Sequence, residues 1–257
     1  MQTQISRLFD LSGRVALVTG GNSGIGKTIG VALASAGASV VLVARREAEL
    51  HEAVHEFDRD GMKAHALACD LADRRALQGF AQRATAPFGA PDILVNASGI
   101  NVRKPFEGVD DDDWDRTIAI NLTAPFLLTR ELAPAMRARG WGRIINITSL
   151  QCLRAFPDSA PYGASKGGLM QLTRATAEYW SKFGVTCNAI APGFFDTPLT
   201  APVLADPARA QAMAQSTMVG RNGNLADLHG AAVFLASDAS AFLTGQTLFI
   251  DGGLSAR

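Results

Sequence analysis

The sequence predicts a single α/β domain, spanning residues 1–257, with a doubly wound parallel sheet that helices cover on both faces. Short apolar, β-branched runs alternate with longer helical segments along the chain, and this alternation is typical of parallel sheets buried on both faces. A glycine-rich turn, 20–26, joins the first apolar run to the first helical segment, where doubly wound folds bind a nucleotide phosphate. The length of 257 residues is sufficient for one large core.

In the first half of the chain, each predicted strand is followed by a predicted helix or by its beginning. We expect a strand at 14–19, a helix at 27–36 that Gly37 stops, a strand at 39–44, a polar helix at about 46–60, a strand at 64–68, a helix from Asp73 and a strand at 93–95. The strands are short and rich in Val, Leu and Ala, which suits strands buried on both faces.

The second half continues the alternation. We expect a long helix at about 113–139, a strand at 143–148, a helix at about 160–183, a strand at 185–191 that ends before Pro192, a helical insertion, a helix at 225–235 and a last strand at 247–250. Pro125 and Pro134 predict a kink or a break in the long helix. The acidic run 110–113 suits the N-terminus of that helix better than a metal site.

The turn Gly20-Gly-Asn-Ser-Gly24-Ile-Gly26 is a candidate phosphate site. Glycines let the backbone approach a pyrophosphate closely, and a helix N-terminus offers free N–H groups and a partial positive charge. The alternative is a glycine turn that binds nothing. The strand before the turn and the helix after it favour the nucleotide site.

Tyr162 and Lys166 are four residues apart within the helix predicted at 160–183, so their side chains share one face. An ammonium group beside a phenol favours the phenolate and lowers its pKa. A tyrosine adjusted in this way can exchange a proton near neutral pH. An ordinary exposed helix pair is the alternative.

Composition excludes several classes of function. The formal net charge is zero and the pI is about 6.9, so neither nucleic acid nor an anionic membrane is an expected partner. No apolar run is long enough to span a bilayer, and the first ten residues resemble no signal peptide. Three scattered cysteines suit reduced thiols and a cytoplasmic protein. His51 and His55 lack a third ligand, so no metal is expected.

The motif 19–26 together with Tyr162-x-x-x-Lys166 resembles the short-chain dehydrogenase/reductase family. Further marks of the family follow in its order along essentially the whole chain: Asn96-Ala-Ser-Gly99, Asn121, Ser149 and Pro192-Gly193. The resemblance implies a Rossmann-type fold and hydride transfer between a nicotinamide cofactor and a secondary alcohol or ketone.

The resemblance also implies a role for each catalytic candidate. Tyr162 is the expected acid/base, and Lys166 lowers its pKa and holds the nicotinamide ribose. Ser149 is expected to hydrogen-bond the substrate oxygen. Asn121 is expected to hold a water molecule that links Lys166 to solvent as a proton relay.

The residues after the second predicted strand indicate the cofactor. Ala44 is followed by Arg45 and Arg46, with no acid until Glu47, and an arginine there accommodates the 2′-phosphate of NADP. We therefore predict NADP(H), with NAD(H) still possible. Asp70 is expected to accept from the adenine amino group, or else to cap a helix. The expected cofactor-binding residues are Gly20, Asn22, Ser23, Gly24, Ile25, Gly26, Arg45, Arg46, Asp70, Leu71, Asn96, Ala97, Gly99, Tyr162, Lys166, Pro192, Gly193 and Thr197.

Arg103 is the main indication of the substrate. It follows the strand at 93–95, at the edge where ligands bind, and an arginine there can hold a carboxylate. It lies where gluconate 5-dehydrogenases of this family carry a substrate-facing arginine, and the fragment 191–199 resembles theirs. We predict a sugar acid or polyol substrate, although Arg103 and Arg154 could be surface charges. The expected substrate-binding residues are Arg103, Ser149, Arg154, Tyr162 and Phe194.

The sequence also fits two alternative functions. A 3-oxoacyl-[acyl-carrier-protein] reductase shares every motif and needs a basic patch for its acidic partner, for which the candidates are Arg103, Lys104, Arg137 and Arg139. A non-catalytic nucleotide-binding scaffold is the second. The resemblance further implies that residues of about 194–220 form a lid over the substrate and that the chain forms a homotetramer or a dimer.

Overall fold

The computed structural model describes residues 3–201 and 205–257, and in this part of the chain seven strands form one parallel sheet. The strand order is β3-β2-β1-β4-β5-β6-β7. The bounds are β1 (Val15–Thr19), β2 (Ser39–Ala44), β3 (Ala64–Ala68), β4 (Ile93–Asn96), β5 (Gly142–Ile147), β6 (Val185–Pro192) and β7 (Thr247–Ile250). The chain therefore winds outward from β1 to β3, returns to the middle at β4 and winds outward again. The predicted doubly wound sheet is confirmed.

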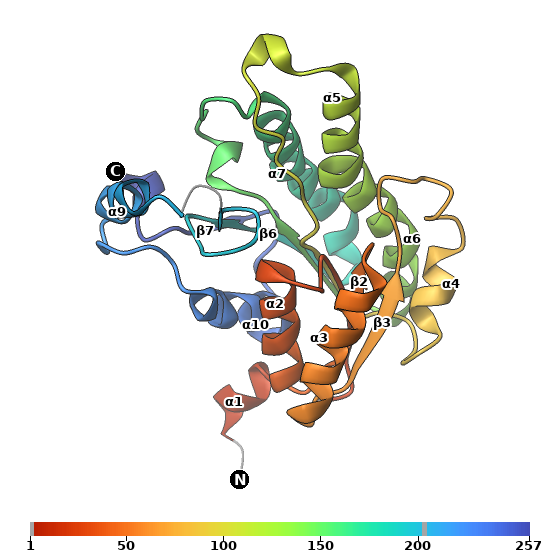
Figure 1. The fold of residues 1–257 in the computed structure, drawn as a ribbon. Coiled ribbons are helices and arrows are strands. Elements are labelled where there is room, and N and C mark those ends of the chain that lie inside the picture. The colour runs from red at the N-terminus through yellow and green to blue at the C-terminus, as the bar shows by residue number, and fades with distance from the viewer. Residues whose placement is uncertain (1–2, 202–204) are drawn as a thin grey trace.

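Helices cover both faces of the sheet (Figure 1). One face carries α2 (Gly24–Ser35), α3 (Glu47–Arg59) and α10 (His229–Ala236), and the other carries α4 (Phe80–Thr85), α5 (Asp111–Ile118), α6 (Ala124–Arg139) and α7 (Ala160–Trp180). Two hydrophobic clusters correspond to the two faces, one around Leu33 and Phe57 and the other around Phe80 and Met136. None of the described helices is long and apolar enough to cross a bilayer.

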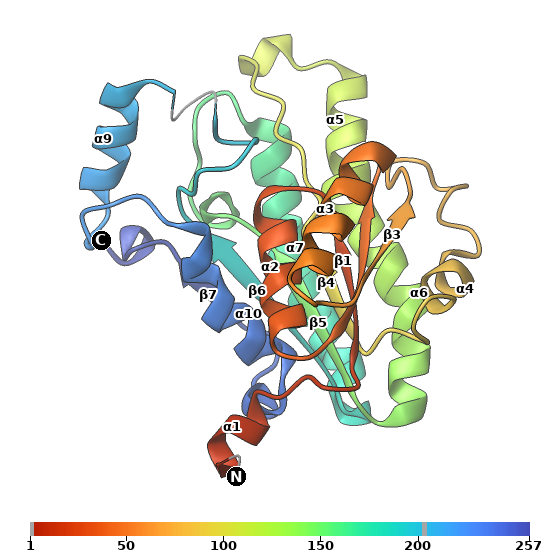
Figure 2. The ribbon, with the colours of Figure 1, turned by 60° about the horizontal axis from the view of Figure 1, so that its bottom comes forward.

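Two short helices lie outside these layers. α1 (Gln4–Leu8) lies at the same end of the molecule as the N-terminus, and α9 (Pro207–Ser216) stands away from the sheet on the side of β7 (Figure 2). α9 falls in the segment predicted as a helical insertion. Residues 202–204 of that segment lie outside the described residues.

The central strands explain the apolar runs in the sequence. Every residue of β1 and β4 is buried, since each strand has a neighbour on both edges and helices on both faces. The edge strand β7 is only half-buried along its length. The bounds of the expected strands match those of the observed strands to within one or two residues, although β6 includes Pro192.

α2 begins three residues earlier than predicted, inside the glycine turn. A Cβ atom on Gly26 would lie 2.3 Å from the carbonyl oxygen of Gly20 and 3.0 Å from that of Thr19. The first turn of α2 therefore packs directly against the end of β1, and only a residue without a side chain permits this approach.

The prediction of a helix from Asp73 is wrong, because residues 71–79 form turns and α4 begins only at Phe80. Asp73 accepts a hydrogen bond from its neighbour Arg75 N at 2.8 Å, and this local bond favours a turn over a helix. Gly79 then adopts a positive φ of 64° directly before α4.

The predicted long helix is interrupted, but not at a proline. Pro125 occupies the first turn of α6, where no N–H donor is needed, and Pro134 lies within α6. The interruption is a π-helical turn, η2 (Ala119–Thr123), between α5 and α6. Asp110 caps α5 and forms a capping box with Asp113, as the acidic run predicted.

Replacement of Gly26 by alanine should destabilise the protein. The added methyl group meets two backbone carbonyls that cannot move independently, and we expect a loss of about 1–3 kcal/mol in the free energy of unfolding. Gly230 in α10 is the matched control, because nothing lies within 4 Å of its added Cβ. Gly230→Ala should stabilise by about 0.5–1 kcal/mol. Urea denaturation measures both changes, and equal effects would contradict the packing argument.

Candidate active site

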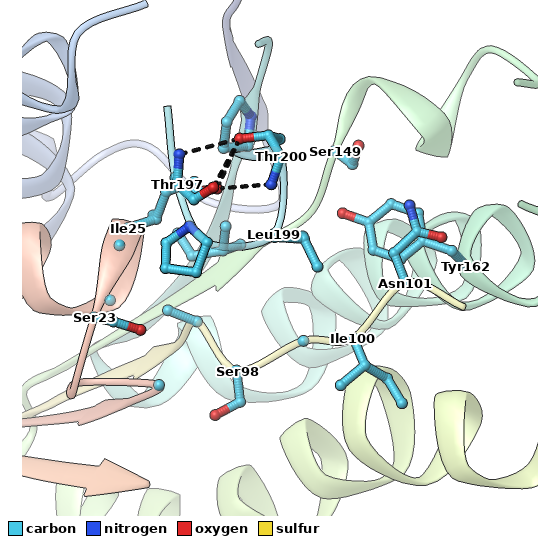
Figure 3. Close-up of a pocket in the computed structure, with 18 of the residues that line it drawn as sticks. Ser23, Ile25, Ser98, Ile100, Asn101, Ser149, Tyr162, Thr197, Leu199 and Thr200 are labelled. Carbon is cyan, nitrogen blue, oxygen red and sulfur yellow. Dashed lines mark hydrogen bonds between the residues drawn. The ribbon is translucent and has the colours of Figure 1, made fainter. Parts of the chain in front are cut away.

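A cavity of about 470 Å³ opens at the carboxyl ends of the strands. Residues that follow β1, β2, β3, β4, β5 and β6 all line it. Ligands of doubly wound sheets bind at this edge, at the point where the strand order reverses. In Figure 3, Ser23 and Ile25 lie at one end of the cavity and Ser149, Tyr162 and Asn101 at the other.

The end of the cavity next to α2 fits a pyrophosphate. Gly20, Asn22, Ser23, Gly24, Ile25 and Gly26 all line it, and cofactor binding by these residues stays a prediction. Ser23 occupies the N-cap position of α2, but its side chain makes no capping hydrogen bond. The N–H groups of the first helical turn therefore have no side-chain cap, which leaves them available to an anion.

Two arginines line the cavity after β2, as predicted, but they differ in their partners. Arg46 Nε lies 2.5 Å from Glu49 Oε1, while Glu49 Oε2 accepts a hydrogen bond of 2.7 Å from Asn22 Nδ2. Among the described residues, Arg45 has no hydrogen-bond or ion-pair partner. Its guanidinium group is therefore available to a phosphate, and Glu49 restrains the second arginine beside it.

Asp70 and Leu71 line the cavity after β3, beside Cys69. Asp70 Oδ1 accepts a hydrogen bond of 3.0 Å from Ala72 N, which leaves its other carboxylate oxygen for a donor in the cavity. Neither this acid nor Asp73 caps a helix, so the alternative interpretation of Asp70 as a helix cap is wrong.

Lys166 and Tyr162 lie on α7 and are both buried, at 3% and 7% exposure. Lys166 Nζ donates to the carbonyl oxygen of Ile147, the last residue of β5, at 2.7 Å and lies 5.5 Å from the centre of the Tyr162 ring. Burial lowers the pKa of Lys166 to about 8. The two side chains share one helix face, as predicted, and both line the cavity.

The predicted fall in the pKa of Tyr162 is not observed. Burial raises the pKa of its hydroxyl, and a hydrogen bond from Ser149 and the positive charge of Arg103 act in the opposite direction. Lys166 is not among the groups that lower this pKa, and its ammonium group donates to the Ile147 carbonyl instead. The tyrosine is therefore held in its protonated form.

Ser149 follows β5 and lines the cavity near Tyr162. Its hydroxyl oxygen accepts a hydrogen bond of 3.2 Å from Gln151 N. Ser149 thereby caps the N-terminus of the short helix η3 (Leu150–Cys152). This local bond fixes the side chain at the end of the strand, where it is within reach of the tyrosine.

Asn121 does not line the cavity but lies behind it, in the π-helical turn. Its Nδ2 donates to the Ile100 carbonyl at 2.9 Å and to Ser165 Oγ at 3.0 Å, and its Oδ1 accepts from Ile100 N at 2.9 Å. The amide therefore positions the segment after β4 against α7. The proton relay remains a prediction.

The prediction that Asn96 binds the cofactor is wrong for its side chain, because Asn96 is buried and does not line the cavity. Its Nδ2 donates to Asn146 Oδ1 at 2.8 Å, which joins β4 to β5. The neighbouring backbone is the part that reaches the cavity. Ala97 N and Ser98 N donate to Thr19 Oγ1 at 3.0 and 3.1 Å, and Gly99 follows them along the wall.

Pro192, Gly193, Phe194 and Thr197 line the cavity after β6, as predicted. The Phe194 ring packs edge-to-face against Phe156, with ring centroids 6.1 Å apart. Hydrogen bonds between Thr197 and Thr200 stabilise the start of the segment that follows β6 (Figure 3).

Arg103 lines the cavity, but the prediction that Arg154 binds substrate is wrong. Arg154 is exposed and does not line the cavity, and its Nη1 donates to the carbonyl oxygen of Leu254 at 3.1 Å. The turn after Ser149 directs this side chain to the C-terminal segment. The short distance of Arg154 from Ser149 along the chain therefore does not indicate which way its side chain points.

Sequence reasoning missed several residues of the cavity wall. Those closest to the predicted catalytic and substrate groups along the chain are Asn101, Gln151, Phe156 and Leu199. Their position just after the ends of β4, β5 and β6 was the available signal. In the part of the chain that the structure describes, no three His, Cys, Asp or Glu side chains are arranged to hold a metal ion.

Known proteins share both the sequence and the fold. Residues 20–255 match the family model described as enoyl-(acyl carrier protein) reductase. The chain is 40% identical to gluconate 5-dehydrogenase of Gluconobacter oxydans, over 96% of this chain and 97% of that protein. A gluconate 5-dehydrogenase from Burkholderia cenocepacia, solved with NADP and tartrate, has a TM-score of 0.94 at 39% identity and covers 99% of this chain and 100% of its own.

A 3-oxoacyl (acyl-carrier-protein) reductase from Agrobacterium tumefaciens, solved with NADP bound, is also similar. Its TM-score is 0.92 at 32% identity, with 97% of each chain covered.

The buried Lys166 should make stability depend on pH. Below about pH 8 the folded and unfolded states both bind the lysine proton, and folding carries the full cost of burying the charge. Between pH 8 and 10.5 only the unfolded state binds it, so stability rises with pH. A shift of this size corresponds to a gain of about 3 kcal/mol.

Urea denaturation of the wild type and of Lys166→Met between pH 7 and 10.5 measures this gain. The difference between the two proteins isolates Lys166 from the other groups that titrate in this range. We expect the wild type to gain stability relative to the variant as the pH rises. If the free energy of unfolding changed with pH in the same way in both proteins, the pKa of Lys166 would not be lowered by folding, and the argument would be wrong.

Proposed function

This chain belongs to the short-chain dehydrogenase/reductase family, and from that premise we propose that its substrate is a sugar acid and its preferred cofactor NADP(H). The protein is an oxidoreductase that transfers a hydride between a nicotinamide cofactor and a secondary alcohol or ketone. Its relatives include gluconate 5-dehydrogenases, so the natural candidates are gluconate and its 5-keto form.

Arg103 is the observation that carries the substrate class. It lines the same cavity as Tyr162, and its positive charge acts on the pKa of that hydroxyl. Among the described residues, its guanidinium group has no hydrogen-bond or ion-pair partner. A free guanidinium beside the proton donor suits a carboxylate at the far end of a short polyhydroxy chain.

The catalytic residues can divide the proton chemistry among them. Tyr162 would donate a proton to the carbonyl oxygen in reduction and remove it from the hydroxyl in oxidation. The Ser149 hydroxyl would bind the same substrate oxygen and stabilise its developing charge. The bound nicotinamide supplies or accepts the hydride. Burial raises the pKa of Tyr162, which favours the protonated form that reduction requires.

Lys166 and Asn121 would support this chemistry from behind the tyrosine. Lys166 reaches the cavity wall, where an ammonium can hold the nicotinamide ribose. Burial lowers the pKa of Lys166 from its ordinary value to about 8, so this side chain can also exchange a proton near neutral pH. Asn121 would position the segment after β4 and hold the water of a proton relay.

The cofactor end supports NADP(H) over NAD(H). The uncapped first turn of α2 fits the pyrophosphate, and the unpartnered Arg45 fits a 2′-phosphate, with Arg46 beside it. Asp70 would accept from the adenine amino group. The relatives from Burkholderia cenocepacia and Agrobacterium tumefaciens were solved with NADP.

A 3-oxoacyl-carrier-protein reductase remains the second candidate, on the strength of the similarity to that enzyme of Agrobacterium tumefaciens. The basic patch expected for its partner does not form, however. Lys104 pairs with Asp110 and Asp113, and Arg139 pairs with Asp92, which precedes β4 at the opposite edge of the sheet. Arg137 packs its guanidinium on the ring of Phe183, 3.8 Å from its centre.

We further propose that residues 1–257 form one domain, with about 194–220 as a substrate lid. The aromatic residue Phe194 and the detached helix α9 support the lid. We also propose a cytoplasmic homotetramer. The free cysteines Cys69, Cys152 and Cys187 suit a reducing compartment, and a solution mass of four chains is the expected result by light scattering.

The substrate proposal is tested by the change in NADP(H) absorbance with D-gluconate, 5-keto-D-gluconate, an uncharged polyol and a 3-oxoacyl thioester. We expect turnover of the sugar acids, and a loss of at least about 100-fold in Tyr162→Phe. Arg103→Met should raise KM for the sugar acids about 10- to 100-fold, because a charge-assisted pair is lost. Arg154→Met is the matched control and should change KM little. Turnover of the thioester alone would refute the proposal.

Cofactor selection is tested separately with Arg45→Ser. Loss of a guanidinium opposite a phosphate should raise KM for NADP about 10- to 100-fold and leave KM for NAD nearly unchanged. Arg59→Ser is the control, since Arg59 is exposed at the other end of α3 and outside the cavity. A wild-type KM for NAD below that for NADP would contradict the preference itself.

A further inference from the structure

Asn101 has an unusual position in the cavity. It lines the wall at the same end as Tyr162 (Figure 3). Its side-chain carbonyl oxygen is buried, and among the described residues it has no hydrogen-bond partner. A buried acceptor without a partner is unfavourable, and most such groups in folded proteins are satisfied. Nothing in the described part of the chain uses this oxygen.

The backbone on both sides of Asn101 is fixed. On one side, Asn121 binds both the N–H and the carbonyl of Ile100, each at 2.9 Å. On the other side, Lys104 N donates to the Asp158 carbonyl at 3.2 Å, and the Lys104 ammonium pairs with Asp110. The segment 100–104 is therefore held at both ends, and Asn101 cannot easily move away to find a partner.

The same segment presents Arg103 to the cavity. Asn101 and Arg103 both line the wall, whereas Val102 between them does not. Ile100, which Asn121 binds, lines the wall directly before them. The amide and the guanidinium are thus two polar groups on one rigid segment, beside the hydroxyl that exchanges the proton.

An amide suits a hydroxyl group of the substrate. Its carbonyl accepts a hydrogen bond, its NH₂ group donates one, and the last torsion of an asparagine side chain is soft enough to turn either atom toward the cavity. A substrate hydroxyl would give the buried carbonyl the partner that it lacks. A substrate without that hydroxyl would leave the group unsatisfied, and sites of this kind discriminate strongly.

We propose that Asn101 is a specificity-determining residue that hydrogen-bonds a substrate hydroxyl close to the reacting carbon. The site thereby selects polyhydroxy acids over simple keto acids with the same carboxylate. This inference rests on the proposed function, in which Arg103 binds the carboxylate and Tyr162 the reacting oxygen.

Two substrates separate the hydroxyl contact from the others. 5-Keto-D-gluconate and 5-oxohexanoate have the same six-carbon chain, carboxylate and ketone, but only the first carries hydroxyl groups. We expect Asn101→Leu, which has a similar size and no polar atoms, to lower kcat/KM for 5-keto-D-gluconate about 10- to 100-fold. Its kcat/KM for 5-oxohexanoate should stay within about twofold of the wild type.

Thermal unfolding gives a readout independent of turnover. Removal of an unsatisfied buried carbonyl should leave the Tm of the unliganded variant equal to or above that of the wild type. 5-Keto-D-gluconate with NADP should raise the Tm of the wild type more than that of Asn101→Leu. Asn222 is the control, because its carbonyl is also buried and unpartnered in the described structure but lies outside the cavity. Asn222→Leu should not change the ratio between the two substrates.

The outcomes distinguish this inference from the proposed function. Turnover of 5-keto-D-gluconate with equal losses on both substrates in Asn101→Leu would refute the hydroxyl contact and leave the function standing. An unchanged variant would do the same. A wild type that reduced 5-oxohexanoate as well as 5-keto-D-gluconate would likewise refute the hydroxyl contact alone, whereas a wild type that reduced neither would overturn both.

Discussion

The site depends on one side chain that never reaches the cavity. The amide of Asn121 makes three hydrogen bonds, two to the backbone of Ile100 and one to Ser165. Ser165 Oγ in turn donates to the carbonyl of Tyr162 at 2.7 Å. A single amide therefore joins the segment that carries Asn101 and Arg103 to the helix that carries Tyr162. The π-helical turn matters for the same reason, because it places this polar residue between two regular helices and directs it inward.

Tyr162 and Lys166, the proposed catalytic pair, are both buried, although burial disfavours the charged form of each side chain. A lysine and a tyrosine are buried against one carbonyl and one serine, with no carboxylate among the groups that shift either pKa. An apolar pair of similar size would make the folded state more stable. The structure holds both groups because the elements around them are fixed independently: β5 supplies the carbonyl, the turn after it supplies the serine, and α7 supplies the tyrosine and the lysine. Such a local cost in folding free energy is common at sites whose groups must change protonation state.

Features that depend on local sequence could be predicted, and features that depend on distant contacts could not. The strands, the glycine turn and the shared helix face of Tyr162 and Lys166 follow from periodicity and from fixed spacings, and the structure confirms them. Arg154 was misplaced because its partner, Leu254, is 100 residues away. Asn96 was misplaced because its amide serves a neighbouring strand. The unpartnered carbonyl of Asn101 could not be predicted at all, since a missing hydrogen bond has no signature in a sequence.

The strand order also determines how exposed the chain is while it is being made. β1 pairs with β2, which follows it directly, and with β4, whose residue Leu94 lies opposite Leu17. Until β4 has left the ribosome, the apolar strand β1 has one open edge, and such edges pair readily with other chains. The glycine turn 20–26 is thus synthesised long before β4, whose following residues support it through Thr19. Synthesis of this protein therefore passes through an interval in which the proposed phosphate site is next to an unpaired strand edge.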